Sequence, residues 1–286
     1  MIGACIGRPA AVAVLAITSQ SPTTVKMKKM SPIKIGSCFS GIGGYDLGVL
    51  AAIPNSQIAW QIEKDPFCQQ VLEKNFPGVT RYGKIESVDA TCLERCDIII
   101  GGWPCTDIAV CGKRAGLEGR ESSLWWEMHR LIRSLRPTAV LLENSPGLTV
   151  RGLDEVLAAL YDGGLCEVEW DTLCASSLGL PHLRERIYII AYTNSLDLRK
   201  LAERCEQEPP ECGHRKSFYE GNQWGVGEAW KTVVRVYGSA YGVPNWVDRH
   251  RSIGNAVVPG LAYLTAKRLL QIASCNSADG EPPAGF

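Results

Sequence analysis

The sequence lacks a hydrophobic run long enough to cross a membrane, and it lacks a net charge of either sign. The apolar stretch at residues 10–17 is far shorter than the roughly 20 residues that a membrane helix needs. Three lysines follow this stretch, which reverses the order found in a secretory signal. We therefore expect a cytoplasmic protein with no membrane partner, and we expect Met27 or Met30 to be its natural start.

Metal-binding and disulfide patterns are also missing. The twelve cysteines contain no pair with the C-x2-C spacing of zinc sites, and there are only four histidines. Cysteines scattered through a chain of 286 residues are typical of reduced thiols and not of a disulfide framework. Because 30 basic residues balance 30 acidic ones, any nucleic acid would have to bind a local basic face. We expect no metal.

What the sequence does contain is an alternation of apolar strands and helical segments, which predicts an α/β fold. The alternation runs through a catalytic domain at 33–193, stops in a small polar region at 194–240, and returns to the domain at 241–273. Residues 1–32 are expected to form a disordered extension and residues 274–286 a flexible tail. The length suits one domain with a small insert.

Cys105 is the candidate nucleophile. It follows the apolar run 97–100, which is typical of a buried strand, and two glycines end that strand. The carboxyl ends of parallel strands face the crevice in which α/β proteins bind ligands. A free cysteine is more often a small core residue, so this hypothesis depends on the groups that accompany it.

A glycine turn after the first predicted strand, residues 33–39, is a candidate ligand site. Gly41, Gly43 and Gly44 would let a ligand approach the backbone, and the helix that follows offers unpaired N–H groups. Glycines in such turns also serve conformation alone. Glu63 ends the next predicted strand about twenty residues later, where an acid of a Rossmann-like unit binds a ribose.

Three more charged side chains are expected to reach the same pocket. Glu143 ends one predicted strand as Cys105 ends the strand before it, so the two groups can face one crevice. Arg184 and Arg186 lie two residues apart where another strand begins, and the alternation of a strand points both side chains the same way.

Five segments resemble, in the family's order, the motifs of the DNA (cytosine-5) methyltransferases, and most closely those of the short phage and prophage type. They are residues 39–44 (FSGIGG), 102–105 (GWPC), 143–144 (EN), 184–186 (RER) and 254–259 (GNAVVP). The resemblance covers roughly residues 34–272 apart from the insert. It implies a Rossmann-like fold that depends on S-adenosylmethionine, with a small target-recognition insert.

The resemblance also implies a reaction. Cys105 would add to C6 of a cytosine flipped out of the duplex, and the resulting enamine would take its methyl group at C5 from S-adenosylmethionine. Glu143 would bind the N3 and N4 edge of the base and protonate N3. Arg186 would hold O2 of the ring, with Arg184 beside it.

Further roles follow from the same resemblance. It places Phe39, Gly41, Gly43 and Gly44 along the cofactor pocket, Glu63 on the ribose, and Asn255 where it helps to close the site. The basic, glycine-studded segment 106–121 would form a lid, and the insert would recognise the target. The implied partners are double-stranded DNA and a cognate restriction enzyme, and we expect a monomer.

Five positions depart from the family's pattern, namely Ser37, Lys84, Glu121, Ser145 and His182, and two of them bear on cofactor binding and on the lid. Lys84 stands where an aspartate usually accepts from the adenine amino group, and an ammonium cannot accept. Glu121 stands where an arginine is usual. Three alternatives stay open: a methyltransferase acting on RNA, a thymidylate-synthase-like enzyme, and an inactive DNA-binding relative. The glycine turn with Glu63 argues against the second, and the presence of Cys105 and Glu143 argues against the third.

Overall fold

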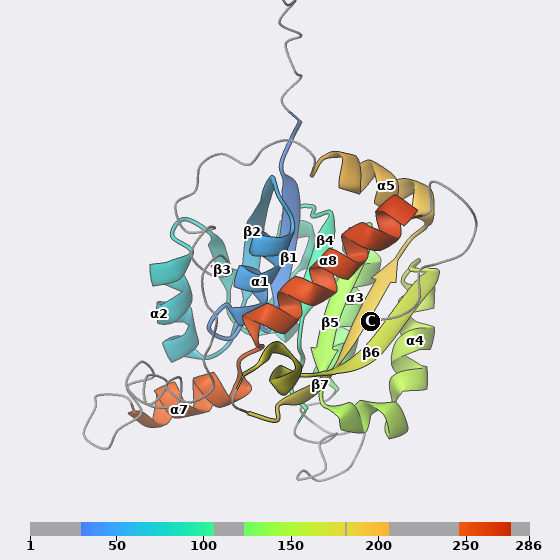
Figure 1. Ribbon diagram of the computed structural model, residues 1–286. Coiled ribbons are helices and arrows are strands. Elements are labelled where there is room, and N and C mark those ends of the chain that lie inside the picture. The colour runs from blue at the N-terminus through green and yellow to red at the C-terminus, as the bar shows by residue number, and fades with distance from the viewer. Residues whose placement is uncertain (1–29, 106–122, 181, 206–245, 276–286) are drawn as a thin grey trace, which may run out of the picture. The chain divides into compact units, whose positions relative to one another are not determined.

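The computed structural model describes residues 30–105, 123–180, 182–205 and 246–275 (Figure 1). The expected lid, most of the polar region 194–240, and nearly all of the terminal extension and tail lie outside these residues. Within them, no helix is long and apolar enough to cross a membrane. All of the described residues except Met30 belong to one compact unit that begins at Ser31.

Seven strands in the described chain form one sheet, with the order β3-β2-β1-β4-β5-β7-β6. They are β1 (Ile33–Cys38), β2 (Ser56–Ile62), β3 (Thr80–Tyr82), β4 (Ile98–Gly101), β5 (Ala139–Asn144), β6 (Glu167–Cys174) and β7 (Glu185–Tyr192). The first five strands pair in parallel, whereas β7 runs antiparallel to both β5 and β6. This arrangement confirms the predicted α/β class.

The reversed direction of β7 sets the position of the arginines. Its register places Ile187 opposite Asn144 and Tyr188 opposite Glu143. The beginning of β7 therefore lies beside the end of β5. Arg184 and Arg186 consequently lie at the carboxyl end of β5, where Glu143 also lies.

Helices cover both faces of the sheet (Figure 1). They are α1 (Gly44–Ala52), α2 (Pro66–Asn75), α3 (Leu124–Leu135), α4 (Leu153–Asp162), α5 (Ser195–Glu203), α7 (Trp246–Asn255) and α8 (Pro259–Cys275). Ile98 and Ile100 of β4 pack with α1, α5 and α8, whereas Ile99 packs with α3 and α4. This split follows from the alternation of side chains along a strand.

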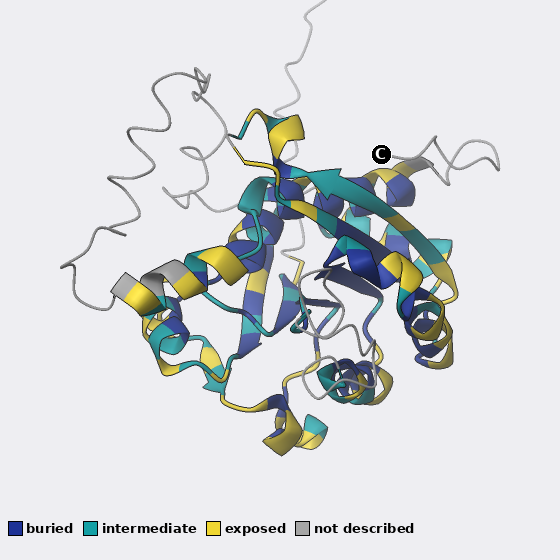
Figure 2. Cartoon of the chain, turned by 90° about the horizontal axis from the view of Figure 1, so that it is seen from below, coloured by how far each residue is buried: buried dark blue, intermediate teal, exposed yellow. Residues whose placement is uncertain are grey.

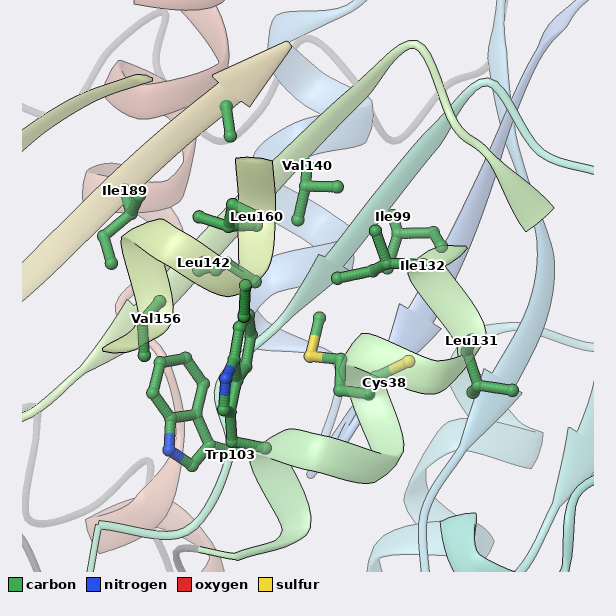
Figure 3. Packing of buried hydrophobic residues seen from close by; sticks show 14 of the residues in the cluster. Cys38, Ile99, Trp103, Leu131, Ile132, Val140, Leu142, Val156, Leu160 and Ile189 are labelled. Atoms are coloured by element: carbon green, nitrogen blue, oxygen red, sulfur yellow. The ribbon is translucent and has the colours of Figure 1, made fainter. Parts of the chain in front are cut away.

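The core under α3 and α4 reaches the segment that carries Cys105. Figure 3 shows Trp103 in the same apolar cluster as Cys38 and Ile99, and its ring centroid lies 4.8 Å from that of Trp125. Figure 2 shows the central strands as buried, in agreement with the full burial of β4 and β5. The strands beneath the candidate nucleophile are therefore firmly packed.

The strand and helix alternation does not stop at Asn194, contrary to our expectation. Asn194 caps α5 by accepting a hydrogen bond from the backbone N–H of Asp197. Leu198 and Leu201 are buried in the core that α5 shares with α8. The helix was missed because only these two apolar residues mark its inner face, while its other face is polar.

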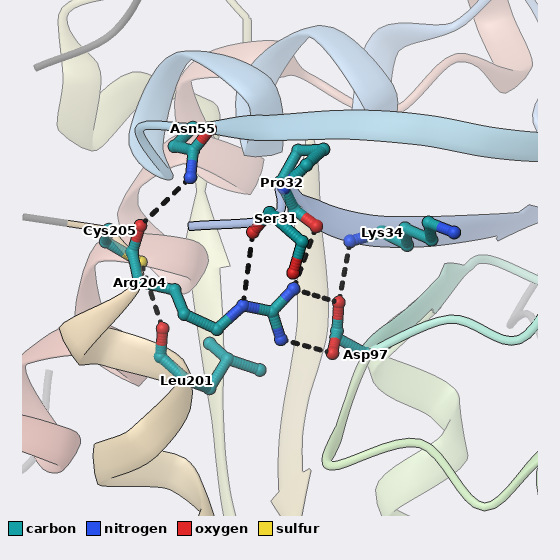
Figure 4. A network of polar contacts seen from close by, with 8 residues as sticks. All are labelled: Ser31, Pro32, Lys34, Asn55, Asp97, Leu201, Arg204 and Cys205. Atoms are coloured by element: carbon teal, nitrogen blue, oxygen red, sulfur yellow. Dashed lines mark hydrogen bonds and ion pairs between the residues drawn. The ribbon is translucent and has the colours of Figure 1, made fainter. Parts of the chain in front are cut away.

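A polar network holds the end of α5 against the amino ends of the strands (Figure 4). The Arg204 guanidinium donates to both carboxylate oxygens of Asp97, at 2.6 and 2.9 Å, and to the Pro32 carbonyl at 2.8 Å. The Asp97 carboxylate also accepts from the backbone N–H of Lys34. The network lies at the amino ends of the parallel strands. The predicted site lies at their carboxyl ends.

Helices α1 and α8 meet at two glycines. A Cβ atom at Gly44 would collide with the carbonyl oxygen of Val257, and one at Gly48 would collide with the carbonyl oxygen of Pro259. The two backbones thus approach as closely as they do because no side chain separates them.

Candidate active site

A cavity of about 370 Å³ opens at the carboxyl ends of the parallel strands. Eight of the ten residues proposed from the sequence line it, namely Phe39, Gly41, Glu63, Cys105, Glu143, Arg184, Arg186 and Asn255. They come from the ends of β1, β2, β4 and β5, from the start of β7, and from the end of α7. The topology thus gathers at one place residues that lie up to about 215 positions apart in sequence.

The two remaining glycines lie behind the cavity lining. Gly43 has a φ of 88°, and a Cβ there would overlap the Phe76 ring. Gly44 is required by the close approach of Val257. Backbone conformation and packing therefore account for these two glycines, although the resemblance implied that they line the cofactor pocket.

Besides Gly43, the turn after β1 holds two further residues in the left-handed region. Phe39 has a φ of 53° and Gly41 one of 54°. For Phe39 this conformation costs on the order of 1–3 kcal/mol, and such strain gathers at functional sites. A Cβ at Gly41 would meet no atom within 4 Å. A ligand therefore has free access to the backbone at this turn.

Glu63 is fixed by the backbone around it. Its Oε2 accepts from the N–H of Gly41 and its Oε1 from the N–H of Asp65, both at 2.8 Å. Asp65 in turn caps α2 by accepting from the N–H groups of Phe67 and Cys68. Each oxygen of Glu63 keeps capacity for a further donor such as a hydroxyl group.

A buried acid that sequence reasoning missed lies beneath the same turn. Asp46 accepts from the Ser37 hydroxyl at 3.1 Å and from the Gln61 amide at 2.8 Å. Burial raises the pKa of Asp46 to about 6, and the hydrogen bonds from Gln61 and Ser37 oppose the rise. No sequence motif marks the trio, because its members come from β1, α1 and β2.

Cys105 is half-buried, and burial raises the pKa of its thiol. Arg186 and Arg184 lower this pKa, whereas Glu143 raises it. We expected a neighbouring arginine to favour the thiolate. Both arginines act in that direction, but burial outweighs them.

Glu143 is only 7% exposed and lies beside the positive charge of β7. The Arg186 Nε is 3.1 Å from Glu143 Oε1, and that oxygen makes no aligned hydrogen bond within the described chain. Burial raises the pKa of the Glu143 carboxyl, against the opposing effect of Arg184 and Arg186. The site therefore holds an acid that retains its proton to a higher pH than usual.

Asn144 connects the end of β5 to the segment that carries Cys105. Its Nδ2 donates to the carbonyl of Trp103 at 3.1 Å, and its Oδ1 accepts from the N–H of Ser145 at 2.8 Å. Asn144 belongs to the EN motif at 143–144, but the sequence indicated no role for this residue. The structure shows it positioning the loop of the candidate nucleophile.

Helix α7 lies along the other side of the cavity. The Arg251 guanidinium forms an ion pair with Asp65, and the Ser252 hydroxyl lies 3.4 Å from Cys68 Sγ. Arg184 donates to the carbonyl of Gly254. The end of α7 is thus joined to α2 and to the start of β7, which places Asn255 at the cavity.

The groups at the cavity suit covalent addition to an electron-poor ring. They comprise a thiol, a carboxyl group with a raised pKa, and a guanidinium that can bind a carbonyl oxygen. Among the residues that the structure describes, no three His, Cys, Asp or Glu side chains gather in a way that could hold a metal ion.

Comparison with known proteins gives a consistent result. The family model described as C-5 cytosine-specific DNA methylase matches residues 33–232. The chain is 32% identical over 165 residues to the type II methyltransferase M.NlaX of Neisseria lactamica, covering 56% of this chain and 52% of that protein. It is 27% identical over 179 residues to M.HhaI of Haemophilus parahaemolyticus, covering 61% of this chain and 54% of that protein. The chain thus spans about half the length of these curated relatives.

One solved structure shows the same fold. The Entamoeba histolytica methyltransferase EhMeth superposes with a TM-score of 0.50 at 17% sequence identity, over 58% of this chain and 54% of that one. This likeness agrees with the Rossmann-like sheet described above.

Proposed function

Because the chain belongs to the C-5 cytosine-specific DNA methylase family, we propose that it methylates C5 of cytosine in double-stranded DNA with S-adenosylmethionine as the methyl donor. One observation carries this proposal. Cys105, Glu143 and Arg186 line the same cavity as the strained turn at Gly41 and the carboxylate of Glu63. An acid–thiol site and a nucleoside site are therefore within reach of one another.

The residues at the turn fit the nucleoside half of S-adenosylmethionine. Gly41 leaves its backbone open to the cavity, and Glu63 presents two oriented oxygens that suit the hydroxyl groups of a ribose. When bound, the donor supplies an electrophilic methyl group.

Cys105 supplies the nucleophile in the proposed reaction. Its thiol first loses a proton to solvent, and the thiolate then forms an Sγ–C6 bond with the cytosine ring. Glu143 gives its proton to N3 as negative charge builds there, and the raised pKa of Glu143 suits this role. The ring becomes an enamine with a nucleophilic C5, which would take the methyl group while the sulfur–methyl bond of the donor breaks and a neutral thioether leaves.

The ring is restored by reversing the addition. A base removes the proton from C5, the Sγ–C6 bond breaks, and N3 returns its proton to Glu143. Arg186 is placed beside Glu143 to hold O2 of the ring throughout. Because Cys105 cannot reach C6 within a stacked duplex, the target base has to leave the stack, at a cost of a few kcal/mol.

The remaining parts of the proposal concern recognition and partners. We assign target recognition to the region 194–240, and since α5 belongs to the core, to its portion after residue 205. The lid stays assigned to 106–121. Type II methyltransferases among the relatives support a restriction partner, and we propose a monomer that acts on DNA in the cytoplasm.

Expression in a host free of cytosine methylation tests the proposal. We expect sequencing to reveal methylated cytosines at a defined site with the wild-type protein, and none with Cys105→Ala. Cys166→Ala is the matched control, because Cys166 is exposed and does not line the cavity. Methylation of RNA alone, or equal DNA methylation by Cys105→Ala, would contradict the proposal.

A further inference from the structure

We propose that Glu86 selects the nucleobase of the methyl donor by accepting a hydrogen bond from the exocyclic amino group of adenine. This inference rests on the proposed function and assigns a residue that the sequence motifs did not contain. Glu86 lies in the short 3-10 helix η1 (Ile85–Ser87), which follows the edge strand β3, and it lines the cavity.

The order of the strands gives the direction in which a bound nucleoside must extend. From the reactive end outward, the cavity is lined after β4 by Cys105, after β1 by Gly41, after β2 by Glu63 and after β3 by Glu86 (Figure 1). Neighbouring strands are about 4.8 Å apart, so β3 lies roughly 14 Å from β4. A ribose at Glu63 with its sulfonium toward Cys105 therefore directs its base toward Glu86.

Glu86 differs from the other carboxylates of the cavity in its hydrogen-bonding partners. Among the four acids that line the cavity, Glu63 accepts from two backbone N–H groups, Asp65 caps α2 and pairs with Arg251, and Glu143 pairs with Arg186. Glu86 makes no hydrogen bond or ion pair with another residue that the structure describes. A carboxylate accepts hydrogen bonds, so Glu86 is able to accept one from the amino group of a bound base.

The backbone that carries Glu86 is held in place from both sides. Arg130 of α3 donates from Nη2 to the carbonyls of Ile85 and Val88, at 3.2 and 2.9 Å. Ile85 is buried in the core and also lines the cavity. Glu86 thus projects from a turn that α3 fixes, which lowers the entropy lost when a ligand binds.

Lys84 does not oppose this assignment. Its side chain is exposed, and the cavity lining contains its neighbours Gly83, Ile85 and Glu86 but not Lys84 itself. The lysine that departs from the family's pattern therefore brings no ammonium group to the cavity wall.

A deaminated ligand tests the hydrogen bond directly. Replacing the adenine amino group by the oxygen of hypoxanthine sets two acceptors against each other, and sites built for a donor reject such analogues strongly. We expect wild-type protein to bind S-adenosylhomocysteine at least about tenfold more tightly than S-inosylhomocysteine in titration calorimetry. In Glu86→Gln the preference should fall to within about threefold, because an amide can donate to the new oxygen.

Glu155→Gln serves as the matched control, since Glu155 is an exposed glutamate of α4 outside the cavity lining, and it should keep the wild-type preference. A wild-type preference in Glu86→Gln would overturn the inference and leave the proposed function intact. If wild-type protein binds neither ligand, the proposed function and the inference both fail. Because Glu86 is exposed, its substitution should leave the circular dichroism spectrum and the melting temperature unchanged.

Discussion

The two ends of the cavity satisfy their charged groups in different ways. At the turn after β1, Glu63 is held by backbone N–H groups within a few residues of itself. At the reactive end, Glu143 lies in β5 and Arg184 directly precedes β7. Each has a buried atom, Oε1 and Nε respectively, without a hydrogen bond in the described chain. At the proposed nucleoside end the backbone holds Glu63 in place, whereas the reactive end keeps buried polar atoms available for a substrate.

From this difference we infer that donor binding and chemistry take place at opposite ends of the cavity. Backbone N–H groups at the nucleoside end fix an acceptor before any ligand arrives, which favours affinity. Buried and incompletely paired groups at the reactive end are costly, and such groups mark sites of chemistry. Substitutions at the reactive end should therefore change the rate, and those at the nucleoside end should change binding or stability.

Glu143→Gln gives the largest expected effect. The amide keeps the shape of the side chain but carries no transferable proton, so the rate of methyl transfer at saturating DNA should fall about 1,000-fold. Duplex binding, measured by fluorescence anisotropy, should stay within about threefold of wild type. Glu155→Gln controls for the loss of one negative charge. An unimpaired rate would show that Glu143 does not donate a proton in the reaction. It would also show that the two ends of the cavity do not differ in the way described.

Asp46→Asn tests the buried acid beneath the nucleoside turn. Burial raises the pKa of Asp46 from its ordinary value of 3.8 to about 6, so between these values the folded protein holds a proton that the unfolded chain has released. Asp46 therefore makes the free energy of unfolding decrease as the pH rises from about 4 to 6, by on the order of 3 kcal/mol. The variant lacks this group.

Urea unfolding of both proteins between pH 4 and 8 measures the effect, and the difference between them cancels the other titrating groups. We expect that difference to change through this interval and to level off above it. Parallel curves would show that Asp46 titrates alike in the folded and unfolded chains.

Glu63→Gln should have the smallest effect of the three, and it should fall on binding. An amide can accept from Gly41 or from Asp65 but not from both, because its NH2 group would face the other N–H donor. The dissociation constant of S-adenosylhomocysteine should rise about tenfold, while methyl transfer at saturating donor stays within about threefold. A large loss of rate with unchanged affinity would show that the two ends are not separate.

Part of the site could be predicted because strand ends leave clear marks in a sequence. Cys105 and Glu143 each follow an apolar run, and parallel strands bring such ends to one edge. The position of the arginines depends on the reversal of β7, which an apolar run does not reveal. The hydrogen bond from Asn144 to Trp103 also requires knowledge of which strands are neighbours.

Several features of the structure could not be read from the sequence. Glycine serves ligand access, left-handed backbone and close packing alike, so the sequence could not separate Gly41 from Gly43 and Gly44. In α5 only Leu198 and Leu201 mark the buried face, and two apolar residues were too weak a pattern to recognise. The pairing of Arg204 with Asp97 joins residues more than 100 positions apart, and no pattern in either segment predicts it.

The contact between α1 and α8 has a consequence for synthesis of the chain on the ribosome. Val257 and Pro259, which pack against Gly44 and Gly48, are translated about 210 residues later. At about 5–20 residues per second, this delay is roughly 10–45 s. During that time the inner side of α1, including Val49, lacks its cover from α8. The segment that begins the proposed nucleoside site is thus made early, and its apolar inner side stays uncovered until α8 has been made.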